Sequence, residues 1–568
     1  MRALLSVENK EELVSLAQGL QALGIELVST GRTAAALAAA SVAVKPVAEI
    51  TGFPEILGGR IKTLHPAIHG GILAKRDDPE HLAQLAELDI TPIDLVVCNL
   101  YPFVESIAQP GVTLEQALEQ IDIGGVTLLR AAAKNFAHVT VLTRPQDYAL
   151  VLKQLQQHGA VQPETRRRLA ALAFQHTACY DSYIASYLRQ VGEHAPSPEE
   201  VTAALEQGQS PSQQQLEAEL FPNELTIPLE KIQPLRYGEN PHQLGAFYRW
   251  KKTSAAPASD PSRPAQGRAS GSLVPSTSQH MATVAGATML QGKELSFNNI
   301  LDLDAALSTA ASFTAPTAVI IKHTNPCGLA CDHQLVEAYR RAHQGDTVSA
   351  YGGIIGFNRV VDEATANELA PLFYEAIIAP GYSPQALETL RKKKNLRLLA
   401  TNSHIGPPAS RGDYALWQLD LRRVSGGVLI QTPDLITEQE MQYRVVSERE
   451  PNLEEVTDLL FAWKAVKHVK SNAIVLAKKL TLIGVGAGQT NRVYSVQIAV
   501  DKAADRARGS VLASDAYFPF PDSVEAAAKA GVTAIIQPGG SIRDEESIRM
   551  ANRYAIAMLM TGQRHFRH

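Results

Sequence analysis

The chain has 568 residues, of which 45% are hydrophobic and 20% charged, so it is long enough for two or three domains that each bury a core. Its formal net charge of -5 excludes an overall basic field that would recruit nucleic acid or an acidic membrane. Four cysteines are too few for a disulfide framework and indicate a reducing compartment, for which the cytoplasm fits best. Because no stretch reaches the roughly 18 apolar residues that a membrane span needs, we expect neither a signal peptide nor a transmembrane helix.

Predicted helices and strands alternate along the first part of the chain. Apolar residues at helical spacing predict a helix over 11–23, which stops at Gly24. The elements expected after it are a strand at 26–29, a helix at 33–40, a strand at 93–100, a helix at 128–134 and a strand at 139–143. Short connections between alternating strands and helices are typical of a mostly parallel sheet that helices cover on both faces.

Composition divides the chain into a first domain at 1–195, a connecting segment at 196–230 and a second domain at 231–568. Within the second domain, the stretch 254–279 is dominated by Ser, Ala, Pro and Gly and is predicted to be a disordered insertion. Strands are expected at 318–321, 481–488 and 533–537, again between helices. A length of about 340 residues is large for one set of α/β layers, so two subdomains are expected, although no sequence repeat is visible between them.

Two polar segments of the first domain could hold an anion. Residues 29–33, Ser-Thr-Gly-Arg-Thr, lie between a predicted strand and the start of a helix, where free N–H groups and the helix dipole favour a phosphate. Ser6 and Lys10 could add donors to the same anion. The loop 58–66 carries two cations and a hydroxyl, which suit an anion or a developing oxyanion. On spacing alone, an ordinary turn and a solvated basic loop explain these segments better.

Three further side chains follow or precede predicted elements of this domain. Asn99 and Tyr101 end a buried strand with an amide and a phenol, and Asp122 stands where a helix opens. Each also has a structural explanation, with Tyr101 as a packed aromatic at the rim and Asp122 as a helix cap.

In the second domain, Lys322 and His323 follow an apolar strand, at the end where open α/β sheets bind ligands. An adjacent Lys and His suit proton transfer beside a stabilised anion, although a solvent-exposed pair is the commoner case. The loop 236–243 offers a guanidinium, an aromatic ring and an imidazole to a phosphate and a heterocycle. Cys327 and Cys331 raise the question of zinc, but their Cys-x-x-x-Cys spacing and the lack of a preceding His-x-Glu disfavour a metal site.

Longer motifs make these patterns specific. The first domain contains Ser-Thr-Gly-x-Thr (29–33), Gly-Gly-Arg-x-Lys-Thr-Leu-His-Pro (58–66), Asn-Leu-Tyr-Pro-Phe (99–103) and Ile-Asp-Ile-Gly-Gly-Val-Thr-Leu-Leu-Arg-Ala-Ala-Ala-Lys-Asn (121–135). The second contains motifs at 296–299 with Asp302, 349–353, 377–382, 470–473, 486–492, 514–520 and 564–568. Together they resemble, along the whole chain, the bifunctional purine-synthesis family that joins inosine monophosphate (IMP) cyclohydrolase to aminoimidazolecarboxamide ribonucleotide (AICAR) formyltransferase.

The resemblance implies an α/β fold in which a methylglyoxal-synthase-like parallel-sheet domain precedes a domain of two cytidine-deaminase-like α/β subdomains without zinc. For the cyclohydrolase it implies the catalytic residues Lys62, Tyr101, Asp122 and Lys134. It further implies the substrate-binding residues Ser6, Lys10, Thr30, Gly31, Thr33, Arg60, Thr63 and Asn99. We expect Lys62 to stabilise the oxyanion, Asp122 to handle the proton of the attacking nitrogen, and Tyr101 with Lys134 to support loss of hydroxide.

For the formyltransferase the resemblance implies that His323 acts as the base for the amine and Lys322 stabilises the oxyanion and the leaving folate nitrogen. The implied nucleotide contacts are Arg236, Tyr237, Asn299, Gly352, Glu375, Asn472 and Arg492. The implied folate contacts are Val493, Tyr517, Asp522, Ser541, Ile542 and Arg564. Two features depart from the family: Glu375 stands where relatives often carry Asp, and the insertion 254–279 is absent from compact members.

The expected reactions are formyl transfer from 10-formyltetrahydrofolate to AICAR, and dehydrating closure of the product (FAICAR) to IMP. No metal is expected, and family members form homodimers with the transferase site completed across the interface. One alternative is a zinc-type nucleoside or nucleotide deaminase fused to a nucleotide-sensing module. A first domain that only senses a nucleotide is another, which the joint presence of Lys62, Tyr101, Asp122 and Lys134 disfavours.

Overall fold

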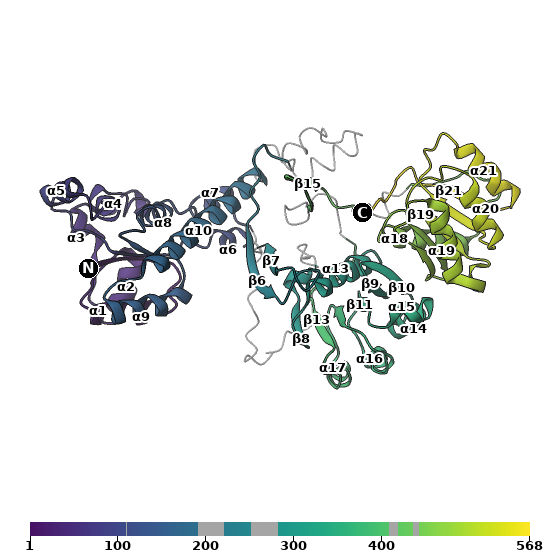
Figure 1. The fold of residues 1–568 in the computed structure, drawn as a ribbon, viewed down its shortest axis with the longest axis horizontal. Coiled ribbons are helices and arrows are strands. Elements are labelled where there is room, and N and C mark those ends of the chain that lie inside the picture. The colour runs from purple at the N-terminus through teal and green to yellow at the C-terminus, as the bar shows by residue number, and fades with distance from the viewer. Residues whose placement is uncertain (110, 191–220, 251–281, 408–418, 435–441) are drawn as a thin grey trace. The chain divides into compact units, whose positions relative to one another are not determined.

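The computed structural model describes residues 1–109, 111–190, 221–250, 282–407, 419–434 and 442–568. By their contacts the residues form two compact units, one of Met1–Glu230 with Trp250–Gln266 and one of Lys231–Arg249 with Gly267–His568 (Figure 1). The predicted insertion 254–279 and most of the predicted connection 196–230 lie outside the described residues, so the predicted domain boundaries stay predictions. None of the described helices is long and apolar enough to cross a bilayer.

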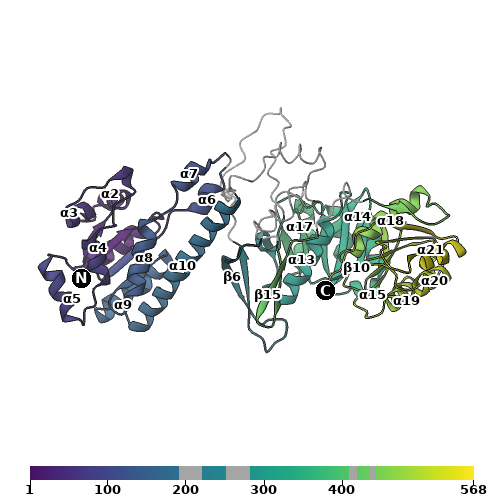
Figure 2. The ribbon, with the colours of Figure 1, turned by 90° about the horizontal axis from the view of Figure 1, so that it is seen from above.

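The first unit is built on a parallel sheet. Its described strands follow the order β3-β2-β1-β4-β5, and every neighbouring pair is parallel. The elements are β1 (Arg2–Ser6), α1 (Leu13–Ala22), β2 (Glu26–Ser29), α2 (Gly31–Ala39), β3 (Lys45–Pro46), α3 (Val47–Thr51), α4 (Pro66–Leu73), α5 (Pro79–Glu87), β4 (Leu95–Cys98), α6 (Phe103–Ile107), α7 (Leu114–Leu118), α8 (Gly124–Lys134), β5 (Thr140–Leu142), α9 (Tyr148–His158) and α10 (Pro163–Gln190). Helices α8 and α10 pack on each other and run side by side (Figures 1 and 2).

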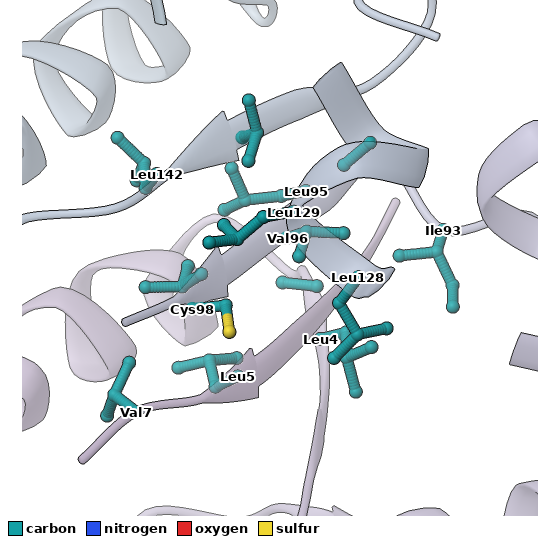
Figure 3. Close-up of a cluster of buried hydrophobic side chains, with 14 of the residues drawn as sticks. Leu4, Leu5, Val7, Ile93, Leu95, Val96, Cys98, Leu128, Leu129 and Leu142 are labelled. Atoms are coloured by element: carbon teal, nitrogen blue, oxygen red, sulfur yellow. The ribbon is translucent and has the colours of Figure 1, made fainter. Parts of the chain in front are cut away.

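The hydrophobic core of this unit lies between the sheet and its helices. Strand β4 is buried at every residue, because its side chains point alternately to two faces that helices cover. Leu4 of β1, Val96 of β4 and Leu128 of α8 belong to one cluster and are fully buried (Figure 3). Burial on both faces explains why the sequence shows a continuous apolar run here.

The predicted elements of this unit are confirmed in type and differ at their ends. The strand predicted at 26–29 is found there, and the helix predicted at 128–134 begins earlier, at Gly124. The long helix α10 was not predicted from the sequence. It supplies Tyr180 to the site described below.

Twelve of the described strands of the second unit form one large mixed sheet in the order β16-β21-β20-β19-β17-β18-β10-β9-β11-β12-β13-β8. Its elements are β8 (Thr288–Gln291), α13 (Phe297–Ala311), β9 (Thr317–Lys322), β10 (Asn325–Cys331), α14 (Leu335–Gly345), α15 (Thr347–Ala350), β11 (Ile354–Phe357), α16 (Glu363–Leu369), β12 (Ala376–Ala379), α17 (Pro384–Arg391), β13 (Arg397–Ala400), β16 (Arg444–Val445), α18 (Leu453–Val466), β17 (Ile474–Lys478), β18 (Thr481–Gly486), α19 (Arg492–Ala503), β19 (Val511–Ser514), α20 (Asp522–Lys529), β20 (Ala534–Gln537), α21 (Asp544–Arg553) and β21 (Ala557–Met560). Two small sheets pair β6 (Leu229–Leu235) with β7 (Gly245–Trp250), and β14 (Asp420–Val424) with β15 (Gly427–Gln431).

The two halves of the large sheet repeat one order of elements. Each half has an edge strand, a helix, an antiparallel hairpin and then three parallel strands separated by helices, from β8 to β13 and from β16 to β21. The halves meet where β10 pairs antiparallel with β18. The expected two subdomains are present, and no repeat is visible in the sequence because the repetition lies in the order of elements and not in the residues.

Candidate active sites

The carboxyl ends of β1 and β4 form the topological switch point of the first sheet. The chain moves outward from β1 to β2 and β3 and then returns to β4 on the other side of β1, and ligands of open α/β sheets bind at such a crevice. The side-chain oxygen of Asn99, directly after β4, accepts the backbone N–H groups of Glu8 at 2.6 Å and Asn9 at 2.9 Å. Asn99 therefore ties together the two loops that line this crevice.

Hydroxyl groups and one ammonium gather beside these loops. Ser6 Oγ lies 3.1 Å from Thr30 Oγ1, and Thr33 Oγ1 donates to the Val7 carbonyl at 2.9 Å. Lys10 Nζ also donates to the Val7 carbonyl and lies 3.4 Å from Thr33 Oγ1, and burial lowers the pKa of Lys10. The structure thus brings four predicted binding residues together where α2 begins and its dipole favours an anion.

Lys62 faces the same turn from the loop before α4. Its Nζ lies 3.3 Å from Oε2 of Glu55 and 3.4 Å from the point where a Cβ on Gly31 would stand. A larger residue at position 31 would therefore crowd the ammonium. Glu55, which sequence analysis did not single out, is the counter-charge of Lys62.

Asp122 and Tyr101 meet beyond the end of β4. The Asp122 carboxylate accepts the backbone N–H groups of Gly125, at 2.6 Å, and of Tyr101. The Tyr180 hydroxyl accepts the N–H of Asp122 at 2.8 Å. Burial raises the pKa of Asp122 above its ordinary value, although the two N–H groups oppose the shift. A carboxyl with a raised pKa suits proton transfer.

Two further predicted cyclohydrolase residues, Arg60 and Thr63, lie in the loop before α4. Thr63 is buried, and its Oγ1 lies 3.1 Å from the point where a Cβ on Gly124 would stand, at the start of α8. Arg60 is paired with Glu119.

The structure separates Lys134 from the other predicted cyclohydrolase residues. Lys134 is exposed at the last residue of α8, about 15 Å along the helix from its start. Within the chain, Lys134 lies at the opposite end of α8 from the Asp122 carboxylate, so its place in the site stays a prediction.

Lys322 and His323 stand at a hairpin turn of the second sheet. Strand β9 ends at Lys322, β10 begins at Asn325, and these two residues pair across the turn. The intervening His323 and Thr324 both have positive φ, 53° and 60°, as a tight two-residue hairpin turn requires. Lys322 Nζ donates to the Tyr351 carbonyl at 2.8 Å. The prediction that the Lys-His pair lies at the end of a strand is confirmed.

Other predicted nucleotide contacts share this edge of the sheet. Gly352 precedes β11 and Glu375 precedes β12, and both strands begin at the edge where β9 ends, because β11 runs antiparallel to β9 and parallel to β12. Glu375 is paired with Arg397 at 2.8 Å. Across the junction of the two halves, Asn325 Oδ1 accepts the N–H of Lys470 at 3.0 Å. The hairpin is therefore tied to the segment that carries the next predicted contacts.

A buried polar network follows Lys470. Arg492 pairs with the carboxylate of Asp515, and its guanidinium donates to Ser514 Oγ at 2.9 Å and to Asn472 Oδ1 at 2.7 Å. Ser471 Oγ donates to the other carboxylate oxygen of Asp515. Two predicted contacts, Asn472 and Arg492, are thus oriented by the carboxylate of Asp515, which belongs to the motif at 514–520 but was not predicted as a contact.

The loop after β6 reaches the start of α13. In this loop, the Glu239 carbonyl accepts a hydrogen bond from Asn298 at 3.3 Å. The Arg236 guanidinium lies 5.9 Å from the centre of the Tyr237 ring. Asn299 is buried and its side chain completes the capping box of α13, so this predicted contact also has a structural role.

The predicted folate contacts flank the carboxyl ends of four strands that run in one direction. Val493 follows β18, Tyr517 and Asp522 follow β19, Ser541 and Ile542 follow β20, and Arg564 follows β21. The side chains of Tyr517, Ile542 and Arg564 are exposed. These three exposed residues follow three different strands, so their role as folate contacts stays a prediction.

The two cysteines of β10 have partners other than a metal. Cys327 Sγ donates to the Ile320 carbonyl at 3.4 Å, and Cys331 Sγ lies 3.2 Å from Thr317 Oγ1. Burial raises the pKa of Cys327 to about 12 and that of Cys331 to about 11, which favours the thiol over the thiolate that binds metal. Within the described ranges, no group of three His, Cys, Asp or Glu side chains could hold a metal ion.

A crevice lined with hydroxyl groups and an ammonium in a parallel α/β domain, followed by a Lys-His hairpin in a duplicated mixed sheet, fits an enzyme that acts on small, charged substrates. Family models agree with this class: residues 12–127 match an MGS-like domain, and residues 132–502 match the AICARFT/IMPCHase bienzyme.

Curated relatives match the chain from end to end. Bifunctional purine biosynthesis protein PurH of Anoxybacillus flavithermus is 49% identical over 567 residues, covering 100% of this chain and 99% of the relative. The protein of the same name from Bacillus cereus strain G9842 is 49% identical over 568 residues with the same coverage. A crystal structure of ForH is 42% identical over 33% of this chain and 95% of its own, at a TM-score of 0.31.

The chain belongs to the AICARFT/IMPCHase bienzyme family. It is a bifunctional enzyme of purine biosynthesis, with AICAR formyltransferase and IMP cyclohydrolase activities that complete the synthesis of IMP. The family implies a formyl-folate co-substrate, and the deaminase alternative is not favoured.

Proposed function

We propose that the two activities occupy the two sites described above, with closure at the switch point of the first sheet and formyl transfer at the His323 hairpin. The observation that carries the assignment is the arrangement of the second sheet. Lys322, Gly352, Asn472 and Arg492 all flank the edge where the hairpin turns, although they come from segments far apart in the chain. A nucleotide bound along that edge meets a cation, an imidazole and an amide.

In formyl transfer, the amine of AICAR attacks the formyl carbon of 10-formyltetrahydrofolate. A C–N bond forms, the amine proton passes to His323, and the bond from the formyl carbon to the folate nitrogen then breaks as that nitrogen takes up a proton. Lys322, whose Nζ is held by the Tyr351 carbonyl, stabilises the charge that develops on the formyl oxygen. The exposed residues Tyr517, Ile542 and Arg564, after β19, β20 and β21, contact the folate.

In closure, the carboxamide nitrogen of FAICAR attacks its own formyl carbon, and water is lost. Lys62 stabilises the oxyanion, and Asp122 accepts the proton of the attacking nitrogen, a role that its raised pKa favours. Tyr101, next to Asp122, supports loss of hydroxide. The hydroxyls of Ser6, Thr30 and Thr33 with Lys10 bind the phosphate.

The enzyme is further proposed to work in the cytoplasm as a homodimer on small-molecule substrates, without a metal and without nucleic acid. Its modest acidic charge and the few cysteines of the chain agree with this environment. Sedimentation of the purified chain tests the dimer, and a purely monomeric protein with full transferase activity would contradict it.

The assignment of sites is tested by measuring the two activities separately in two variants. Lys62→Ala should abolish closure and leave formyl transfer intact. His323→Ala should lower the rate of formyl transfer by at least roughly 100-fold and leave closure of added FAICAR intact. Each variant is the control of the other, because each should keep the activity of the site in the other unit. Loss of both activities in either variant, or retention of the predicted one, would contradict the assignment.

A further inference from the structure

The turn that carries His323 includes one residue in an unfavourable backbone conformation. His323 and Thr324 both adopt the left-handed region, which Gly, Asn, Asp and His adopt more readily than other residues. A β-branched threonine is especially unfavourable there. The turn therefore needs an outside contact to hold it, and the direction of the His323 side chain depends on that contact.

Asp302 supplies the contact from the neighbouring helix. Its Oδ1 accepts the N–H of Thr324 at 2.7 Å, and its carboxylate also accepts the N–H of His323. Asp302 lies in the second turn of α13, whose start is fixed by the capping box of Ser296. Burial raises the pKa of Asp302, while both N–H groups and the nearby His323 side chain favour its charged form.

The same device occurs once more in the repeated half of the sheet. Asp458 of α18 accepts the N–H groups of Lys479 and Leu480, both at 2.7 Å. These two residues form the β17–β18 turn, again with positive φ, 53° and 55°. Asp302 and Asp458 each stand six residues after the capping residue of their helix, Ser296 or Asn452. We call this contact, in which a helix aspartate accepts both N–H groups of a hairpin turn, an aspartate clamp. It is a feature of both halves of the duplicated fold.

The two clamps differ in what they hold. The turn held by Asp458 lies at the opposite edge of the sheet, because β10 and β18 are antiparallel, and none of the predicted reacting residues flanks it. Only the turn held by Asp302 carries an imidazole beside Lys322 and the Asn472 network. The repeat therefore provides a matched structural control for any effect of Asp302 on chemistry.

We propose that Asp302 is a positioning residue of the formyltransferase, which holds the His323-Thr324 turn so that the imidazole of His323 faces the amine of the nucleotide. This inference rests on the proposed role of His323 as the base. A second tie supports it: Asn325 donates to the His323 carbonyl at 3.0 Å while it accepts the N–H of Lys470. The turn is thereby fixed from the helix on one side and from the other half of the sheet on the other.

The test compares Asp302→Asn with Asp458→Asn. Each change keeps one acceptor oxygen and replaces the other with an NH2 group, which cannot accept the second N–H of the turn. Asp302→Asn should lower kcat of formyl transfer by about 10- to 100-fold with little change in KM for AICAR, because misplacement of a reacting group affects the chemical step. Asp458→Asn should leave kcat unchanged, and both variants should close FAICAR at the normal rate.

A second change separates positioning from simple instability. Thr324→Gly removes the conformational cost of the turn, so it should restore a large part of kcat when combined with Asp302→Asn. Equal kcat in Asp302→Asn and Asp458→Asn, or no recovery in the double variant, would overturn the proposal. A normal transfer rate in His323→Ala would instead contradict the proposed role of His323 as the base. The failure of that role is thereby distinguished from the failure of the positioning role of Asp302.

Discussion

The guanidinium of Arg492 and the carboxylate of Asp515 form an ion pair whose side chains are only 5% and 0% exposed. Both groups have further hydrogen bonds, Arg492 to Asn472 and Asp515 to Ser471, so the pair organises the buried end of the proposed nucleotide site. Breaking a buried pair by removing one charge is costly, because the other charge is left in a medium of low polarity.

Asp515→Asn should therefore destabilise the second unit by about 3–5 kcal/mol and raise KM for AICAR. Chemical denaturation followed by a probe in that unit measures the first effect, and steady-state kinetics the second. The exposed pair of Arg340 and Glu368 is the control, because Glu368→Gln should change neither stability nor KM measurably. Equal stability of the two variants would contradict the structural role of Asp515.

Asp122 should make the stability of the first unit fall, and the rate of FAICAR closure rise, as the pH increases. Its pKa is raised in the folded protein, so its protonated form is the one that folding favours. Its contribution to stability is present below the unfolded value and is lost as pH rises through the folded pKa. The difference in unfolding free energy, Asp122→Asn minus unaltered protein, should therefore increase with pH across that window.

The rate of closure should rise with pH, because a proton acceptor must be ionised. The rate of FAICAR closure should fall with decreasing pH at values above the 3.8 of an ordinary aspartate. Measuring both quantities from about pH 4 to about pH 8 tests the pair of trends. An acid limb at or below the ordinary aspartate value would argue against Asp122 as the base.

Glu55 should act against the binding of an anionic substrate. It lies 3.3 Å from Lys62 Nζ, so its charge competes with the substrate for the ammonium. Glu55→Gln should lower KM for FAICAR by a few-fold at low salt and by less at high salt, since this pair is partly exposed and screened. Glu26→Gln, whose carboxylate pairs with Arg2 and Lys45, should leave KM unchanged. An unchanged KM in Glu55→Gln at both salt concentrations would contradict the competition.

Gly486 should be intolerant of a side chain for reasons of packing. A Cβ there would lie 1.9 Å from the Ser495 carbonyl oxygen of α19, the helix that begins with Arg492. Gly486→Ala should destabilise the second unit by about 1–3 kcal/mol and weaken AICAR binding, as measured by denaturation and calorimetry. Gly381→Ala is the control, because only Val360 lies near its added Cβ, at 4.0 Å. Similar losses in both variants would rule out close approach as the cause.

Much of the fold follows from local patterns in the sequence. The apolar run of β4 reflects its burial on both faces of the sheet. The alternation of strands with helices predicted the parallel sheet. The repeat in the second unit was not predicted, because Asp302 and Asp458 are equivalent only through their distance from a helix cap. Such an equivalence appears once helices and turns are placed in space.

The candidate sites were predicted in part. Motifs named Lys322 and His323, and the hairpin geometry then explained how they are held. Glu55, Asp302 and Asp515 were not named as site residues, since each acts through a partner distant in the chain: Lys62, the His323 turn and Arg492. Lys134 was named from a motif and lies at the last residue of α8, so its role in closure stays a prediction.

The assignment of both reactions is tested by incubating the purified chain with AICAR and 10-formyltetrahydrofolate and following FAICAR and IMP over time. The unaltered chain should form IMP, Lys62→Ala should accumulate FAICAR without IMP, and His323→Ala should form neither at a comparable rate. Absence of IMP from the unaltered chain, or IMP formation by Lys62→Ala at the normal rate, would contradict the assignment.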